Sequence, residues 1–179
     1  FAATYRAARQ VSGDFYDFYT LPGEGGRIGM VIADVVDKGV PAALFMALSR
    51  TVIRTMALSG RDPAATLKKA NQLILKDSRA SLFLTAFYAT LNPQNGSLKY
   101  ANAGHNRPIW LHADTGECQD LIAEGSLLAV MDTLELKERE VTLKTGDLLV
   151  MYTDGVTEAM NLEREIFGEQ RLQSVIEKN

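Results

Sequence analysis

Hydrophobic and polar residues follow strand-like patterns near the start of the chain. Residues 14–21 alternate aromatic with other side chains, which predicts a strand with one buried face. Residues 27–33 form an apolar run rich in valine and isoleucine, which predicts a buried strand that stops at Asp34. The glycine cluster between them, at residues 23–26, predicts a turn. It is not a dinucleotide-binding loop, because its spacing differs and a strand follows it instead of a helix.

Three segments carry apolar residues at helical spacing. Residues 42–58 form the first, and Pro41 suits the first turn of a helix. A second helix is predicted at residues 63–76 and a third at residues 169–178. The first two helices interrupt a series of strands, so they are expected to cover a sheet.

The second half of the chain reads as a series of strands and turns. Strands are predicted at residues 82–91, 97–102, 107–112 and 148–153, with turns at 92–96, 103–106 and 114–116. Helices inserted among antiparallel strands predict an α+β fold in which the helices cover sheet faces. No linker or internal repeat interrupts the 179 residues, which predicts a single domain over residues 1–179.

Composition narrows the functional classes. The chain is 46% hydrophobic and 23% charged, which is typical of a globular protein and excludes a disordered one. Its net charge of −3 argues against nucleic acid as a ligand. The single cysteine, Cys118, excludes an internal disulfide and indicates a reducing, cytoplasmic location. No secretory leader or bilayer-spanning stretch is visible, so no membrane partner is expected, and the start at Phe1 indicates a fragment of a longer polypeptide.

Three aspartates lie where predicted strands begin or end near glycine. Asp14 follows a glycine, Asp154 precedes one, and Asp34 lies five residues before one. Strand ends gather at one rim of a sheet, and clustered carboxylates there are stabilised by cations. Oxygen ligands select Mg²⁺ or Mn²⁺, and two such ions activate water for attack on phosphorus. The alternative is that the three are turn residues, which aspartate also favours; spacing alone leaves both interpretations open.

Four segments of the sequence resemble segments of a known protein family. These are Ser-Gly-Asp-Phe-Tyr-Asp (12–17), Ala-Asp-Val-Val-Asp-Lys-Gly-Val-Pro-Ala-Ala-Leu (33–44), Asn-Ala-Gly-His-Asn-Arg-Pro (102–108) and Tyr-Thr-Asp-Gly-Val-Thr-Glu-Ala (152–159). They resemble the metal-dependent serine/threonine protein phosphatase (PPM) family, in its bacterial SpoIIE/RsbU-like branch. All four occur in the family's order, and residues 167–172 resemble the stretch that follows, so the resemblance covers nearly the whole chain.

The resemblance implies a four-layer αββα sandwich of two antiparallel sheets flanked by helices, with two Mn²⁺ or Mg²⁺ ions at one edge. By the family pattern Asp34 bridges both ions and the Val35 carbonyl completes one coordination sphere. Asp154 binds one ion, and Asp14 binds an ion directly or through another ligand. Asp17 is a further candidate ligand; its alternative role, an outward residue of an alternating strand, stays open. The implied reaction is hydrolysis of phosphoserine or phosphothreonine by metal-bridged water, with Asp14, Asp34 and Asp154 as catalytic residues.

Several positions depart from the family pattern. Arg9 lies five residues before Asp14, where the broader family places a phosphate-binding arginine; the alternative is a solvated surface residue. His105 occupies a turn where the broader family carries an aspartate near a third metal, so it is a candidate for contact with phosphate or a metal; the alternative is a hydrogen-bonded turn residue. Asp37 replaces a small residue, where it adjusts the surroundings of the ligands or leads into the helix.

The family normally ends on an Asp-Asp-x-Thr strand that supplies another metal ligand. The chain stops at Asn179, before that strand, so the resemblance leaves the activity of this fragment open. It implies the output domain of a longer signalling protein with an upstream sensor or receiver domain. The implied substrate is a small phosphorylated protein of the anti-sigma-factor antagonist type in a partner-switching pathway, and a homodimer fits such regulation. The alternatives are a catalytically weak pseudophosphatase that acts as a binding module, and a metal hydrolase for a small phosphoester.

Overall fold

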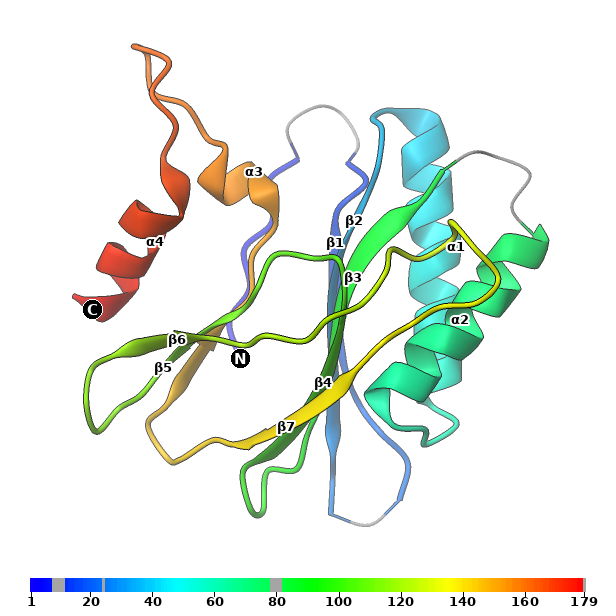
Figure 1. Cartoon of the computed structure of the whole chain (residues 1–179), viewed down its shortest axis with the longest axis horizontal. Helices are drawn as coiled ribbons and strands as arrows, with labels where there is room; N and C mark the ends of the chain where they lie inside the picture. Colours follow the sequence, from blue (N-terminus) through cyan, green and yellow to red (C-terminus); the bar gives the residue numbers. More distant parts are fainter. Residues whose placement is uncertain (8–11, 24, 78–81, 179) are drawn as a thin grey trace.

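The computed structural model describes residues 1–7, 12–23, 25–77 and 82–178 (Figure 1). The first half contains β1 (Phe15–Thr20), β2 (Ile28–Val35), α1 (Val40–Ala57), α2 (Pro63–Asp77) and β3 (Leu84–Leu91). The second half contains β4 (Ser97–Ala103), β5 (Ile109–Leu111), β6 (Cys118–Asp120), β7 (Glu138–Thr142), β8 (Leu148–Val150), α3 (Asp154–Thr157) and α4 (Gly168–Glu177).

Within the described residues the strands form two antiparallel sheets. The larger has the order β1-β2-β3-β4-β7 and the smaller the order β6-β5-β8. Helices α1 and α2 pack on the larger sheet, whereas α4 packs on the smaller one (Figure 1). The predicted α+β fold, a layered sandwich of two antiparallel sheets flanked by helices, is confirmed.

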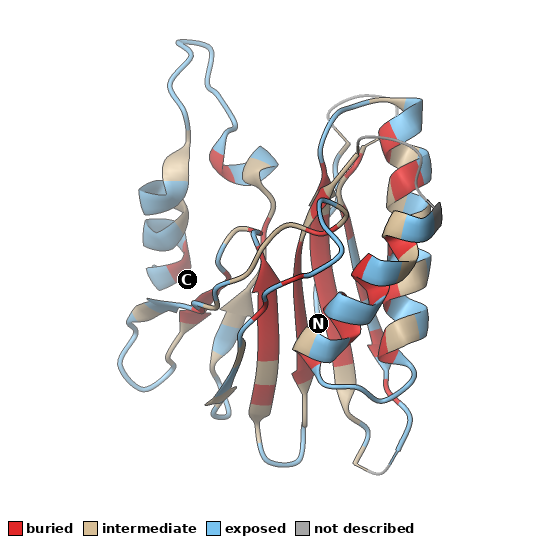
Figure 2. Cartoon of the chain, turned by 45° about the vertical axis from the view of Figure 1, so that its right-hand side comes forward, coloured by how far each residue is buried: buried red, intermediate tan, exposed pale blue. Residues whose placement is uncertain are grey.

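Three hydrophobic layers hold the sandwich together. The first lies between α1, α2 and the larger sheet, and includes Phe45, Ile53 and Leu67. The second lies between the two sheets, and the third lies between the smaller sheet and α4. Figure 2 shows that buried residues run along the strands and along the sides of α1 and α2 that face the sheet. The outer sides of these two helices are exposed. Burial on both faces explains why residues 28–33 read as a continuous apolar run.

The direction of each side chain on the larger sheet follows the two-residue period of a strand. On β2, Val31 and Ala33 join the layer under the helices, whereas Met30 and Ile32 join the layer between the sheets. Asp34 continues the second series, so it lies on the inter-sheet face. This alternation decides which polar residues are able to meet.

Three strand predictions need correction, and one strand was not predicted. The strand predicted to stop at Asp34 continues to Val35, which places Asp34 inside β2. The strand predicted at 148–153 ends at Val150, and Asp154 begins α3. The strand predicted at 107–112 is shorter, because only Ile109–Leu111 form β5, which pairs with β6 and β8. Sequence reasoning missed β7, because its residues are mostly charged and it completes the edge of the larger sheet through backbone pairing with β4.

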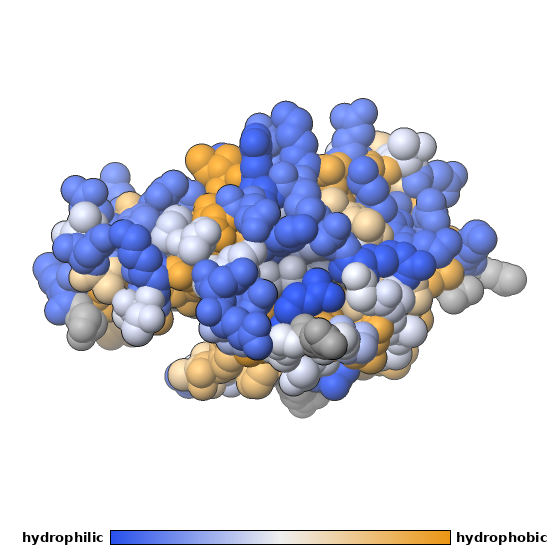
Figure 3. All heavy atoms as spheres, turned by 90° about the horizontal axis from the view of Figure 1, so that it is seen from below, coloured by the Kyte–Doolittle hydropathy of each residue, from blue (hydrophilic) through white to orange (hydrophobic). Residues whose placement is uncertain are grey.

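The two ends of the larger sheet differ in chemistry. The turn between β1 and β2 and the turn between β3 and β4 lie at the lower end in Figure 1. Seen from there, the surface is mostly hydrophilic and its visible apolar residues form small separate groups (Figure 3). Since β1 starts and β2 stops at the other end, the conspicuous aspartates lie there. None of the helices in the described ranges is long and apolar enough to cross a membrane.

Candidate functional site

The structure brings Asp14, Asp34 and Asp154 together at one end of the space between the sheets. Antiparallel pairing places the start of β1 beside the end of β2, so Asp14 and Asp34 become neighbours. Asp154 arrives from the smaller sheet, at the start of α3. The Thr153 hydroxyl donates a hydrogen bond of 2.8 Å to Asp14 Oδ2 and thereby ties the two sheets together. Residues distant in sequence thus share one site.

The burial of Asp34 beside two other carboxylates changes its pKa. Its side chain is half-buried, and its pKa is raised from 3.8 to about 7. Burial is the largest cause, followed by contact with the carboxyl of Asp14 and the negative charge of Asp154, while Lys38 opposes the rise. Three neighbouring carboxylates concentrate negative charge at this position, and a divalent cation is a partner that offsets such a charge.

The donor groups at this position fit Mg²⁺ or Mn²⁺. Both ions prefer carboxylate and carbonyl oxygens, and Val35 adds a backbone carbonyl beside Asp34. Gly13 packs so closely here that an added Cβ would lie 2.7 Å from the Val35 oxygen. Among the described residues no group of three or more His, Cys, Asp or Glu side chains is arranged so that it could hold a metal ion. The fit therefore rests on the chemistry of the neighbouring oxygens, not on a preformed cage.

A cavity of about 400 Å³ opens beside the aspartates. It is lined by Asp34, Thr85, Gly104, His105, Asn106, Arg107, Asp120, Tyr152, Asp154 and Glu169. These residues come from both sheets and from α4, so the cavity exists only in the assembled sandwich. Its size and its mainly polar lining suit a small charged group.

His105 is held firmly in the wall of this cavity. Its N–H donates to the Asn102 side chain at 2.7 Å, and its carbonyl accepts from the same amide at 2.9 Å. Its Nδ1 lies 2.7 Å from the hydroxyl of Thr85, which pairs with Asp34 across the sheet. Burial lowers the pKa of His105 to about 4, against the opposing influence of the Tyr152 backbone and Asp14. The ring is thus neutral at pH 7, and its role toward phosphate stays a prediction.

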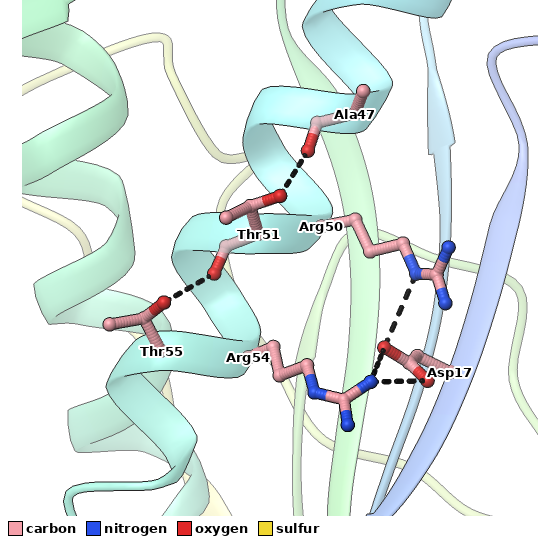
Figure 4. A network of polar contacts seen from close by, with 6 residues as sticks. All are labelled: Asp17, Ala47, Arg50, Thr51, Arg54 and Thr55. Atoms are coloured by element: carbon pink, nitrogen blue, oxygen red, sulfur yellow. Dashed lines mark hydrogen bonds and ion pairs between the residues drawn. The ribbon is translucent and has the colours of Figure 1, made fainter.

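Asp17 does not belong to this site, which corrects its assignment as a metal ligand. It is buried on the opposite face of the larger sheet, where it accepts hydrogen bonds from Arg50 Nε at 3.2 Å and Arg54 Nη1 at 3.1 Å (Figure 4). It shares its alternation with Phe15 and Tyr19, which pack under the helices. The alternative of an outward residue is wrong as well, because Asp17 faces α1.

The two remaining candidates from the sequence are Arg9 and Asp37. Arg9 lies outside the described residues. Asp37 is exposed and adopts a φ of 81°, and its side chain accepts a hydrogen bond from the Lys38 N–H at 2.7 Å. It therefore shapes the turn before α1, whose N-cap is Gly39.

Sequence reasoning missed several residues of the site. Thr153 orients Asp14, and Thr85 joins Asp34 to His105, yet neither belongs to a recognisable charge pattern. Arg107 lies inside a segment that carries the family resemblance, but its position in the cavity wall follows from the fold. Their common signal is three-dimensional proximity.

Comparison with known proteins decides the family. Residues 24–179 match the sequence model of the family described as Stage II sporulation protein E (SpoIIE). The chain belongs to the SpoIIE family. It is 33% identical over 172 residues to phosphoserine phosphatase RsbU of Bacillus subtilis, a match that covers 96% of this chain and 50% of that protein. It is 30% identical to protein IcfG of Synechocystis, covering 99% of this chain and 32% of that protein.

Solved structures place the SpoIIE-family chain in the same fold. The RsbU and RsbW domains of Rv1364c from Mycobacterium tuberculosis align with a TM-score of 0.79 at 24% identity, over 97% of this chain and 47% of that one. The SiaA-PP2C domain of Pseudomonas aeruginosa gives a TM-score of 0.78 at 24% identity, over 93% of this chain and 65% of that one. RsbX, whose structure was solved in complex with magnesium, gives a TM-score of 0.66 at 17% identity, over 96% of this chain and 81% of that one. The chain spans half or less of the curated relatives RsbU and IcfG.

Proposed function

We propose that this chain is the catalytic domain of a metal-dependent phosphatase that hydrolyses phosphoserine or phosphothreonine on a small regulatory protein. The observation that carries the proposal is the convergence of Asp14, Asp34 and Asp154 beside a polar cavity, where burial first and the two neighbouring carboxylates second raise the pKa of Asp34 to about 7. The similarity to phosphoserine phosphatases RsbU and RsbP supports the same reaction class.

In this proposal some residues of the chain hold the ions and others position those ligands. Asp34, Asp154, Asp14 and the Val35 carbonyl would hold two Mn²⁺ or Mg²⁺ ions. When bound, such ions lower the pKa of water and offset negative charge on a phosphoryl group. Asp14 is kept in place by the Ser12 hydroxyl at 3.1 Å and by Thr153 at 2.8 Å. Its orientation is therefore fixed before any ion arrives, which reduces the cost of assembling the site.

The physiological setting of the proposal follows from the relatives. RsbU and RsbP of Bacillus subtilis are named phosphoserine phosphatases, and both are longer than the matched region. We therefore assign this chain to the output end of a signalling protein with an upstream sensor or receiver domain. The proposed substrate is a phosphorylated protein of the anti-sigma-factor antagonist type, and a homodimer would bring two such output domains under one input.

A hydrolysis assay tests the reaction. The chain is incubated with p-nitrophenyl phosphate or a phosphoserine peptide, in Mn²⁺ or in EDTA. Turnover is expected only with Mn²⁺, and Asp34→Ala and Asp154→Ala are each expected to abolish it. Asp62→Asn serves as the matched control, because Asp62 is an exposed carboxylate whose ion pair with Lys99 is on the surface.

Two outcomes would contradict the proposal. Turnover that persists in EDTA or in Asp34→Ala would show that the aspartates do not hold the catalytic ions. Absence of turnover in a folded, Mn²⁺-bound wild-type chain would favour the alternative of a protein-binding module without catalysis. Circular dichroism of each variant separates loss of activity from loss of fold.

A further inference from the structure

The cavity beside the aspartates has an unusual balance of charge. Among its described lining residues, Asp34, Asp120, Asp154 and Glu169 are acidic, whereas Arg107 is the one lysine or arginine. Cations bound to the aspartates would offset Asp34 and Asp154 but not the other two acids. A phosphoryl dianion that enters this space therefore needs a further positive group on the protein.

Arg107 is free to supply that group. The side chain is exposed, and within the described part of the chain it makes no hydrogen bond or ion pair. Its charge does reach the hydroxyl of Tyr152: burial raises the pKa of that hydroxyl most, Glu169 and Asp120 raise it further, and Arg107 lowers it. The guanidinium thus lies in the same electrostatic field as the two acids without being neutralised by either. An arginine in a cavity wall with all its donors unused is suited to a bidentate anion.

The backbone holds the base of Arg107 in a fixed position. Reciprocal hydrogen bonds between Asn102 and His105 lock the preceding turn. Pro108 is buried and restricts the backbone of the residue before it. The Pro108 carbonyl accepts a hydrogen bond of 2.9 Å from the N–H of Leu121, which anchors the following residues to the neighbouring hairpin. Only the flexible side chain remains to be ordered when an anion binds.

We propose that Arg107 binds the phosphoryl oxygens of the substrate in this cavity. The inference rests on the proposed function and adds a substrate-binding residue to it. The guanidinium fork matches two oxygens of a phosphoryl group, and Arg107 lines the same cavity as Asp34 and Asp154, so it contacts the phosphoserine itself and not a flanking residue of the partner protein. Arg107 is the one lysine or arginine among the described residues that line the cavity.

Inorganic phosphate is the probe that tests this contact directly. Its affinity for the Mn²⁺-loaded chain is measured by calorimetry, and its inhibition constant by competition with p-nitrophenyl phosphate. Arg107→Ala is expected to weaken both by about 10- to 100-fold, as for the loss of one bidentate charge-assisted contact. Arg107→Lys should fall between, because lysine keeps the charge but not the fork. Mn²⁺ affinity should not change.

Arg139→Ala is the matched control, because Arg139 is a half-exposed arginine on β7 whose ion pair with Glu124 lies on the surface. Unchanged phosphate affinity in Arg107→Ala would overturn the inference, as would a wild-type chain without measurable phosphate binding. An effect of Arg107→Ala on a phosphoprotein but not on phosphate would show a contact with protein and overturn it as well. Phosphate binding through Arg107 without any hydrolysis would instead remove the phosphatase proposal and leave this one standing.

Discussion

Replacing Asp34 with asparagine should stabilise the metal-free chain and remove its stabilisation by metal. In the folded state the carboxyl of Asp34 has a pKa of about 7, against 3.8 for an ordinary aspartate. The folded protein therefore binds this proton more tightly than the unfolded chain does. The favourable contribution is complete below pH 4 and is lost as the pH rises toward 7, where ionised Asp34 faces the charges of Asp14 and Asp154.

The size of the effect follows from the shift. A difference of about three pKa units corresponds to about 4 kcal/mol if the group is fully shielded from water. Asp34 is only half-buried, so solvent screening reduces the expected value to about 1–2 kcal/mol. In EDTA at pH 8, Asp34→Asn should raise the free energy of unfolding by that amount, and the gain should shrink toward zero near pH 4.

Urea denaturation in EDTA and in Mn²⁺ measures both halves of this prediction. The wild-type chain should gain stability from Mn²⁺, because the ions bind the folded state and offset the clustered charge. Asp34→Asn should gain far less, so the order of stability reverses between the two buffers. Asp17→Asn is the matched control, because Asp17 is buried but paired with Arg50 and Arg54. It should lower stability by about 1–3 kcal/mol in both buffers.

The reasoning fails if Asp34→Asn is less stable than wild type in EDTA at pH 8. Such a result would mean that ionised Asp34 is compensated within the protein itself. Equal stabilisation of wild type and Asp34→Asn by Mn²⁺ would refute the assignment of the ions to this site.

Substitutions at three further positions probe the surroundings of the site and the packing of α2. Gly13→Ala should lower the free energy of unfolding, measured by urea denaturation, by about 1–3 kcal/mol, because the added Cβ meets the Val35 carbonyl at 2.7 Å. It should also weaken Mn²⁺ binding in calorimetry. Unchanged values would contradict this close approach. Asn71→Leu should cost about 2–4 kcal/mol by thermal unfolding, because fully buried Asn71 bonds the backbone at 2.7 and 2.8 Å; a stable variant would contradict that role. Asp37→Gly should match or exceed wild-type stability, whereas Asp37→Ala should lose about 1 kcal/mol, since only glycine adopts a φ of 81° without strain; the opposite order would argue against strain.

The local pattern of the sequence determined most of the elements. Helical spacing in residues 42–58 and 63–76 predicted α1 and α2, and the apolar run at 27–33 predicted most of β2. These predictions succeed because burial of one helix face or of both strand faces requires a matching period in the sequence. Charged β7 lacks such a period, so its membership in the sheet depends on backbone pairing with β4 and was not visible.

The sequence and the tertiary structure likewise determined different parts of the candidate site. The sequence alone predicted that Asp14, Asp34 and Asp154 share one site, mainly through the family resemblance of the segments that contain them, whereas their spacing left a role as turn residues open. The odd spacing between Asp14 and Asp17 already places them on opposite faces of the strand, but only the tertiary structure decided that two arginines of α1 lie beside Asp17 and that Arg107 lines the cavity. The physical reason is that sequence spacing fixes the side of a strand on which a residue lies, whereas long-range pairing and layer packing fix what occupies that side.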